Sequence, residues 1–300
     1  MAEFISDTLD LSAYLVEKHE GENIRPASFF SDQLTHFFYG GGAHDGALLP
    51  WQKTHEVIRL RAGEVSLWHG ENYSGKSTLT SHVATDLCAQ GYRVCIASME
   101  MMPAKTLAKM CRQALGDNQP SKDGLAQFNT WTDEKLWIYD RRGSVDWEKM
   151  LAVIRYAVDK FDIHHFFVDS LMKCVRGETD YDGQKDFVNG LCVVAQDCDV
   201  HIHLVHHTKK PTLDEVPNRY QAKGSGSISD QVDNVFGVWR KRNKNSSGDK
   251  PDCIVNCDKQ RNGEWDGQIH LWFDPAGLQY RGDQHGPHVR QYINPVQAEA

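Results

Sequence analysis

The sequence predicts an α/β fold in which a mostly parallel central sheet is covered by helices on both faces. From Leu48 onward, short apolar runs with the character of strands alternate with segments of helical periodicity, which is typical of parallel sheets. The last apolar runs follow one another with no helix between them, so we expect an edge of antiparallel hairpins. One main domain, residues 48–283, accounts for both observations.

The single elements follow from periodicity and from the glycines and prolines that bound them. Residues 64–68 indicate a strand, and residues 78–89 indicate a helix because Leu79, Val83 and Leu87 share one face. The expected strands are 64–68, 93–98, 136–139, 164–168, 201–205, 234–239, 252–256 and 268–273. The expected helices are 78–89, 103–115, 146–160 and 184–198.

Residues 1–47 differ from the domain and predict a short N-terminal helical arm or linker. Residues 7–18 carry an apolar stripe, although so short a helix is not stable alone in water. Five aromatic side chains then precede a glycine run that indicates a loop or hinge: Phe29, Phe30, Phe37, Phe38 and Tyr39. Two interpretations stay open, because the arm either packs against a neighbouring subunit or covers its own domain. Residues 284–300 are expected to form a C-terminal tail.

Composition excludes several classes of protein. The net charge of −8 argues against a uniformly basic nucleic-acid coat, although a local basic channel is compatible with it. No apolar run approaches the length of a membrane span, and the first residues lack the features of a secretory signal. The eight cysteines are scattered and indicate free thiols in a reducing compartment. Cys253 and Cys257 lie in an expected strand, which disfavours a metal site there.

The most informative motif is the run G-x-x-x-x-G-K-S at residues 70–77, between a strand and a helix. Backbone N–H groups of such a loop wrap phosphates, the lysine reaches the β- and γ-phosphates, and the serine hydroxyl binds Mg²⁺. The sequence therefore predicts binding of ATP or another nucleoside triphosphate with Mg²⁺. The residues expected to contact the nucleotide are Gly70, Asn72, Tyr73, Ser74, Gly75, Lys76, Ser77 and Thr78.

Polar side chains follow three other strands. Asp169 ends an apolar strand and is the expected partner of Ser77 at the metal, unless it is an ordinary solvent-facing acid. Glu100 is the expected base that activates water, with a helix-capping acid as the alternative. His207 is placed to sense the γ-phosphate, and a purely structural histidine is the equal alternative.

The order of motifs resembles the RecA-like motor domain of hexameric replicative helicases, a family that includes the DnaB type, phage primase-helicases and mitochondrial Twinkle. The resemblance spans about residues 48–280 and rests on the phosphate loop, strand-Met-Glu, strand-Asp-Ser and strand-His-His-Thr-Lys. Two later motifs, K-G-S-G-S at 223–227 and K-Q-R-N-G at 259–263, separate this family from other phosphate-loop ATPases.

The resemblance implies roles for further residues. Lys259 and Arg261 match a Lys-x-Arg pair that reaches into the neighbouring subunit's site, where it stabilises charge in the transition state. A charged hairpin turn is the alternative, and the two are compatible because Asn-Gly follows directly. Arg240 and Phe273 resemble residues that hold the nucleotide base between them.

The resemblance also implies two loops that face single-stranded DNA in a central hole. The first contains Lys173 and Arg176, and the second contains Lys209, Lys210, Arg219 and Lys223. Cations with little aromatic interleaving grip phosphates rather than bases, so binding is expected to be independent of DNA sequence. Lys223 stands where phage relatives often have arginine, and it keeps the positive charge but lacks the bidentate geometry of a guanidinium.

The resulting prediction is an ATP-driven, ring-shaped helicase that is a homo-oligomer, most simply a hexamer, and moves on single-stranded DNA. A RecA-, RadA- or KaiC-like ATPase without unwinding activity is the alternative, and a nucleotide-binding switch that grips a partner through residues 29–39 is a third. Primase or polymerase partners and a cytoplasmic location, in a bacterium or in the host of a phage, are expected, and a mitochondrial location stays open. With only about 50 residues before the motor and no zinc pattern, primer synthesis is not expected in this chain, which is a stand-alone motor or part of a longer protein.

Overall fold

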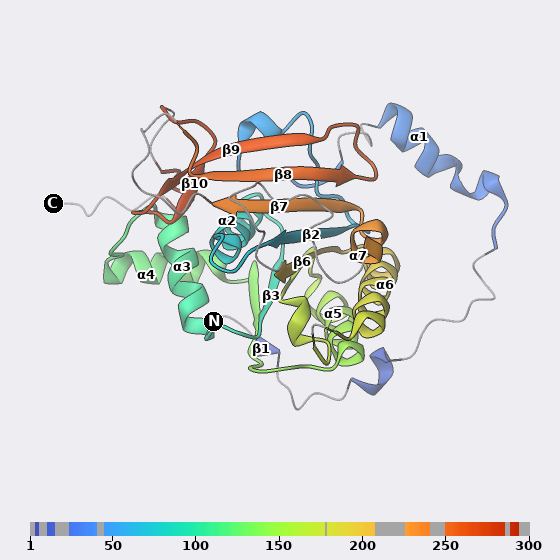
Figure 1. The fold of residues 1–300 in the computed structure, drawn as a ribbon. Helices are drawn as coiled ribbons and strands as arrows, with labels where there is room; N and C mark the ends of the chain where they lie inside the picture. The colour runs from blue at the N-terminus through green and yellow to red at the C-terminus, as the bar shows by residue number, and fades with distance from the viewer. Residues whose placement is uncertain are drawn as a thin grey trace.

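A ten-stranded sheet forms the centre of the molecule (Figure 1). The computed structural model describes residues 4–5, 11–15, 24–40, 45–177, 179–207, 226–240, 250–285 and 289–293. The strands are β1 (Phe4–Ile5), β2 (Val65–Gly70), β3 (Val94–Ser98), β4 (Leu136–Tyr139), β5 (His165–Asp169), β6 (His201–His207), β7 (Asn234–Arg240), β8 (Cys253–Gln260), β9 (Gly267–Asp274) and β10 (Gln279–Arg281). Their order in the sheet is β1-β4-β3-β5-β6-β2-β7-β8-β9-β10.

The pairing confirms the predicted α/β fold class. All pairs from β1 to β7 are parallel, whereas β7, β8, β9 and β10 pair in antiparallel fashion. The expected strands 252–256 and 268–273 correspond to β8 and β9, so the antiparallel edge lies where the intervening helices were missing from the sequence. A β-bulge interrupts the pairing of β7 with β8 between Val235 and Phe236.

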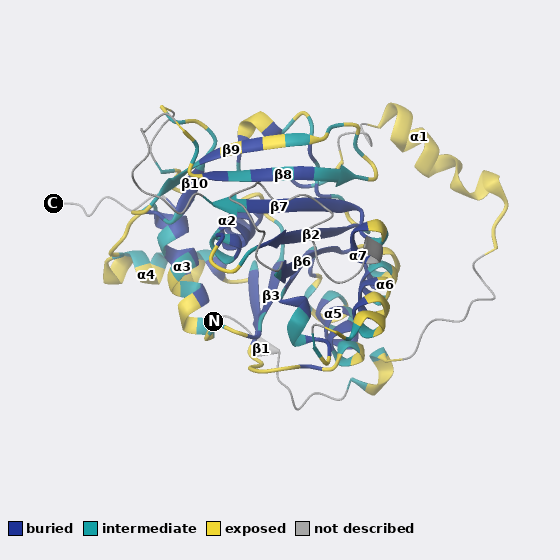
Figure 2. Cartoon of the chain, in the orientation of Figure 1, coloured by how far each residue is buried: buried dark blue, intermediate teal, exposed yellow. Residues whose placement is uncertain are grey.

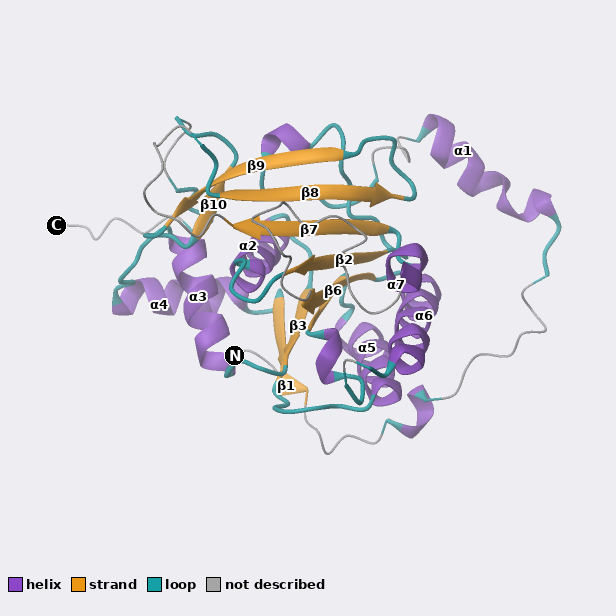
Figure 3. Ribbon diagram, viewed as in Figure 1, coloured by secondary structure: helices purple, strands orange, loops and turns teal. Residues whose placement is uncertain are grey.

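Helices cover both faces of the parallel part of the sheet (Figures 1 and 3). The helices are α1 (Ser31–Tyr39), α2 (Lys76–Ala89), α3 (Pro103–Leu115), α4 (Lys122–Thr132), α5 (Trp147–Phe161), α6 (Tyr181–Cys198) and α7 (Gly226–Gln231). The described 3-10 helices are η1 (Ser12–Tyr14), η3 (Ala27–Phe30), η5 (Gln52–Thr54) and η6 (Leu171–Lys173).

Alternation along β2 divides the core into two clusters. Leu67 packs in the cluster shared with α5 and α6, and the next residue, Trp68, packs in the cluster shared with α2 and α3. Because successive side chains of a strand point to opposite faces, both faces of a central parallel strand are apolar. Every residue of β2 is buried, and Figure 2 shows the central strands as the buried interior.

The sequence did not predict the bounds of α4, α7, β1 and β10. α4 begins at Ser121, whose hydroxyl accepts a hydrogen bond of 3.0 Å from the backbone N–H of Gly124, and it buries Phe128 against α3. β1 adds to the edge beside β4, and β10 closes the antiparallel edge. These short strands carry little periodicity of their own, since pairing with a neighbour is what makes them strands.

The aromatic segment, for which no element bounds were predicted, contains the helix α1. Leu34, Phe37 and Phe38 lie at helical spacing, and none of its nine residues is buried. Figure 2 shows it exposed along its length, away from the sheet. The helix expected at 7–18 is described only at residues 11–15, where η1 occupies three residues and the remainder lies outside the described residues.

Residues near the C-terminus pack on the domain where they are described. Arg290 forms an ion pair with Asp86 of α2 at 2.9 Å, and the backbone N–H of Tyr292 donates to the carbonyl of Ala114 in α3. All eight cysteines are free. No described helix combines the length and apolar character required to cross a membrane.

Candidate nucleotide-binding site

Four predicted site elements meet at one edge of the sheet. The phosphate loop follows β2, His207 ends β6, Asp169 ends β5, and Glu100 follows β3 closely. The register pairs Gly70 with His207 and Ser98 with Asp169. Because these strands are parallel neighbours, their carboxyl ends share an edge, which is where open α/β sheets bind ligands.

The phosphate loop adopts the conformation that its glycine demands. Gly75 has a φ of +87° and directly precedes α2, so its carbonyl accepts the first helical hydrogen bonds, from Thr78 and Leu79. A side chain at this position would be strained, and the Tyr280 hydroxyl lies where its Cβ would be. The loop therefore places the free N–H groups at the start of α2, where the helix dipole favours anions.

Lys76 is held against the loop itself. Its ammonium donates to the carbonyls of Gly70 and Glu71, each at 2.7 Å, and only 3% of the residue is exposed. Burial lowers the pKa of Lys76 to about 8, while the charges of Asp169, Glu100 and Glu71 act in the opposite direction. A phosphate anion beside this buried cation would restore favourable charge compensation.

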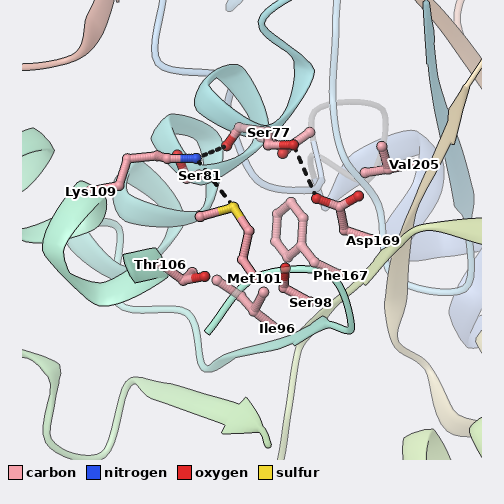
Figure 4. A pocket seen from close by; sticks show the side chains of 11 residues that line it. Ser77, Ser81, Ile96, Ser98, Met101, Thr106, Lys109, Phe167, Asp169 and Val205 are labelled. Carbon is pink, nitrogen blue, oxygen red and sulfur yellow. Dashed lines mark hydrogen bonds between the residues drawn. The ribbon is translucent and has the colours of Figure 1, made fainter. Parts of the chain in front are cut away.

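Ser77 and Asp169 lie together and form a candidate cation site. The hydroxyl of Ser77 donates to Oδ2 of Asp169 at 3.2 Å (Figure 4). Burial, followed by the charge of Glu100, raises the pKa of Asp169, and the hydrogen bond from Ser77 and the charges of Lys76 and Lys109 partly offset this. A hydroxyl and an under-compensated carboxylate are hard oxygen ligands, so these two residues fit Mg²⁺.

Glu100 lies at the rim of the site with its side chain 44% exposed. Its carboxylate is 3.8 Å from the ammonium of Lys173, one of the residues expected to contact DNA. The following helix, α3, has Met102 at its N-cap position and no side-chain cap. The geometry therefore leaves Glu100 accessible to a water molecule at the carboxyl edge.

His207 is half-buried at the end of β6. Burial, followed by the nearby charge of Lys76, lowers the pKa of His207. Its Nδ1 atom is buried and has no hydrogen-bond partner among the described residues. A neutral imidazole next to Lys76 is positioned to respond to charge on a bound phosphate.

The pair Lys259 and Arg261 lies at the opposite edge of the sheet. Gln260 pairs with Asn234, which pairs with Ser66 near the start of β2, about four residues or ~13 Å before Gly70, the first residue of the phosphate loop. The Lys259 ammonium donates to three carbonyls around the end of α7, at 2.7 to 3.1 Å. Arg261 donates to the Gln231 carbonyl at 2.7 Å and pairs with Asp233 at 3.1 Å.

Arg240 and Phe273 lie beside the phosphate loop in direct contact. The guanidinium carbon of Arg240 is 4.4 Å from the centre of the Phe273 ring, which is itself 5.2 Å from the Tyr280 ring. This spacing is that of a single stack and leaves no room for a base between the two side chains. A base would stack on the outer face of the guanidinium or separate the pair.

Only part of the expected DNA surface is described. Lys173 pairs with Glu100, and Arg176 is exposed, with its backbone N–H donating to Asp180 at 3.1 Å. Lys209, Lys210, Arg219 and Lys223 lie outside the described residues.

Two residues that contact the candidate site, Tyr280 and Lys109, were not predicted from the sequence. Tyr280 reaches Gly75 from β10, and Lys109 reaches Ser77 from α3. A signal for Lys109 was present, because it lies on the same helical face as Thr106, Met110 and Gln113, which are all buried. A lysine on the buried face of a helix next to a phosphate loop is a candidate site residue.

Comparison with known proteins agrees with this description. The sequence profile of the family described as the AAA domain matches residues 56–212, more than half of the chain. The solved structure of the ATPase domain of G40P superposes with a TM-score of 0.74 at 15% identity, over 86% of this chain and 99% of that chain. A DnaB-like replicative helicase, studied with its primase interactions, superposes with a TM-score of 0.70 at 13% identity, over 86% of this chain and 67% of that chain. These likenesses confirm the fold of a RecA-like motor domain.

Proposed function

Because the chain belongs to the AAA domain family, we propose that it hydrolyses ATP with Mg²⁺ at the carboxyl edge of its parallel strands. One observation carries the proposal: the phosphate-loop hydroxyl of Ser77 lies 3.2 Å from the partly buried carboxylate of Asp169. A chance phosphate-loop sequence would not place its serine against an acid that ends another strand. We take ATP as the preferred nucleotide. Hydrolysis assays with the other nucleoside triphosphates test this preference.

The residues divide the chemistry among them. Lys76 and the N–H groups of residues 70–78 hold the phosphates, and Ser77 and Asp169 hold Mg²⁺, which neutralises phosphate charge when it is bound. Glu100 accepts a proton from the attacking water, and His207 responds to the γ-phosphate. Removing the carboxylate in Glu100→Gln is expected to stop hydrolysis and to spare binding of a fluorescent ATP analogue. Loss of that binding would contradict the role of Glu100 as base.

We further propose that the protein is a ring-shaped homo-oligomer, with a hexamer as the simplest case, that moves on single-stranded DNA. The fold shared with a DnaB-like replicative helicase supports this. The position of Lys259 and Arg261 also supports a ring. The pair lies at the amino ends of the neighbouring parallel strands, too far from the phosphate loop of its own chain to reach it. A role of this pair in hydrolysis would therefore require a neighbouring subunit's site.

The test is the ATPase rate per subunit measured against protein concentration, with and without single-stranded DNA. A site completed by a neighbour gives a rate that rises with concentration, and coupling to DNA gives stimulation by the strand. Arg261→Ala should abolish hydrolysis and spare nucleotide binding. A concentration-independent, DNA-independent rate would reject the ring helicase while leaving the ATPase.

A RecA-, RadA- or KaiC-like ATPase without unwinding activity is the second candidate. The observation that favours it is the engagement of Lys259 and Arg261 at the end of α7 of their own chain. Contacts to a neighbour's nucleotide would have to replace these hydrogen bonds. Electron microscopy of the ATP-bound protein separates closed rings from open filaments, and a forked DNA substrate tests unwinding directly.

The proposed domain division assigns residues 1–47 to an arm, residues 48–283 to the motor and residues 284–300 to a tail. The apolar side chains of α1 are exposed, including Phe37 and Phe38 at 55% and 67%. We propose that α1 packs on a neighbouring subunit, as exposed apolar patches often do. Replacing Phe37 and Phe38 by serine should lower the oligomer mass in solution. A primase or polymerase partner is a further proposal, resting on the replicative helicase fold alone.

A further inference from the structure

Lys109 is a partly buried cation on α3 that lines the same cavity as the proposed metal ligands. Its ammonium donates to the backbone carbonyl of Ser77 at 3.3 Å and contacts the sulfur of Met101 at 3.9 Å (Figure 4). The two contacts lie in different parts of the site. Ser77 belongs to the first turn of α2, and Met101 directly follows Glu100. One side chain thus touches the segment that holds the metal and the segment that carries the proposed base.

A small cavity separates Lys109 from Asp169. Its volume is about 20 Å³, and its polar lining includes Ser98, Thr106 and the two charged groups. The hydroxyl of Thr106 is buried and has no hydrogen-bond partner among the described residues. A cavity of this size and polarity suits a single water molecule, which needs two to four polar partners.

We propose that Lys109 is a positioning residue that fixes the Ser77 turn relative to the Glu100 segment and, through a water in this cavity, orients Asp169. The proposal rests on the Mg²⁺-dependent ATPase function proposed above. The positive charge of the ammonium acts across this cavity on a partly buried carboxylate, where electrostatic interactions are stronger than in water. In this proposal, Lys109 on α3 helps to position Ser77 and Asp169, in addition to the phosphate loop itself.

The alternative is that Lys109 has a packing role only. The aliphatic stem of a lysine covers apolar surface, and Ile96 and Phe167 line the same cavity. In that case the stem contributes packing, and the hydrogen bond to Ser77 contributes only to stability. The substitution Lys109→Met distinguishes the two, because it keeps an unbranched apolar stem and removes only the charged donor.

The experiment compares wild-type protein, Lys109→Met and Lys105→Met, in which an exposed lysine of the same helix is changed. Three quantities are measured: kcat for ATP, the Mg²⁺ concentration that gives half-maximal rate, and the affinity for a fluorescent ATP analogue in EDTA. Thermal unfolding is followed in parallel. For Lys109→Met we expect kcat to fall about tenfold or more, as for loss of a hydrogen bond from a charged group, and the Mg²⁺ midpoint to shift.

The affinity in EDTA and the unfolding temperature of Lys109→Met should stay near those of Lys105→Met, because the phosphate loop is intact. Thr106→Val, which removes the unpaired hydroxyl without changing shape, should shift the Mg²⁺ midpoint in the same direction by a smaller amount. Unchanged kcat and Mg²⁺ midpoint in Lys109→Met would overturn the proposal. So would a parallel loss of stability and of affinity in EDTA, which would show a structural role only. A wild-type protein without Mg²⁺-dependent hydrolysis would instead reject the proposed function itself.

Discussion

Acid should destabilise the protein through histidines that the fold keeps buried and neutral. His201 is fully buried, with Nδ1 2.5 Å from the Arg61 carbonyl and Nε2 2.8 Å from the Ser66 hydroxyl. Nδ1 must donate to the carbonyl, so Nε2 accepts from the serine in the neutral ring. Burial lowers the pKa of His201 to about 4. In the neighbouring residues His165 and His203, Nδ1 of the first lies 3.3 Å from Nε2 of the second. Burial lowers the pKa values of both well below the usual range.

The direction of the pH effect on stability follows from proton uptake by the folded and the unfolded chain. An exposed histidine in the unfolded chain has a pKa near 6.5, and His201 in the folded chain has a lower one, so the unfolded state binds more protons as pH falls. Stability is therefore lost progressively below about pH 6.5, down to the folded pKa. Between pH 7 and pH 5, the titration of His201 lowers the free energy of unfolding by ~2 kcal/mol. This corresponds to about 1.5 pH units below the unfolded pKa, at ~1.4 kcal/mol for each unit.

A difference measurement isolates this effect, because buried carboxyl groups with raised pKa values, such as Asp86 and Asp233, act in the opposite direction. The free energy of unfolding is measured by denaturant titration with tryptophan fluorescence at pH 7 and pH 5, for wild type and His201→Asn. Asparagine retains a donor for the Arg61 carbonyl and does not titrate. The destabilisation caused by the substitution should shrink by ~2 kcal/mol at pH 5. The exposed His270→Asn serves as control and should show the same small difference at both pH values. An equal loss at both pH values in His201→Asn would refute the reasoning.

Three further predictions concern the site. Gly75→Ala forces a side chain into a φ of +87° and against the Tyr280 hydroxyl, so nucleotide affinity should fall by about tenfold or more, measured by titration of a fluorescent analogue. Asp169→Asn keeps the shape of the side chain and removes the charge beside Ser77. Mg²⁺-dependent hydrolysis should fall by about a hundredfold, and nucleotide binding in EDTA should be retained. Hydrolysis at the wild-type rate would exclude Asp169 as a metal ligand. Arg240→Gln removes the cation stacked on Phe273, and affinity for ATP should drop about threefold to tenfold, whereas unchanged affinity would place the base elsewhere.

Local patterns along the chain determined much of the site. The strand, glycine turn and helix around Gly75 follow from short-range rules, because a φ above zero and a helix start depend on neighbouring residues. Asp169 and Glu100 were found because polar residues after apolar strands stand out in sequence. Parallel strands then bring their carboxyl ends together in any order, so the common edge was predictable without knowing the strand order.

Tertiary structure alone decided which distant residues meet. The insertion of β2 between β6 and β7 sets the neighbours of the phosphate loop, and no periodicity encodes it. Tyr280 reaches Gly75 only because β10 closes the antiparallel edge, and Lys109 reaches Ser77 only because α3 packs on α2. Lys259 was predicted from its motif, yet its contacts with the end of α7 depend on the folding of β8 beside β7. Periodicity and turn chemistry act over a few residues, whereas these contacts join segments far apart in the chain, and packing of the whole core selects them.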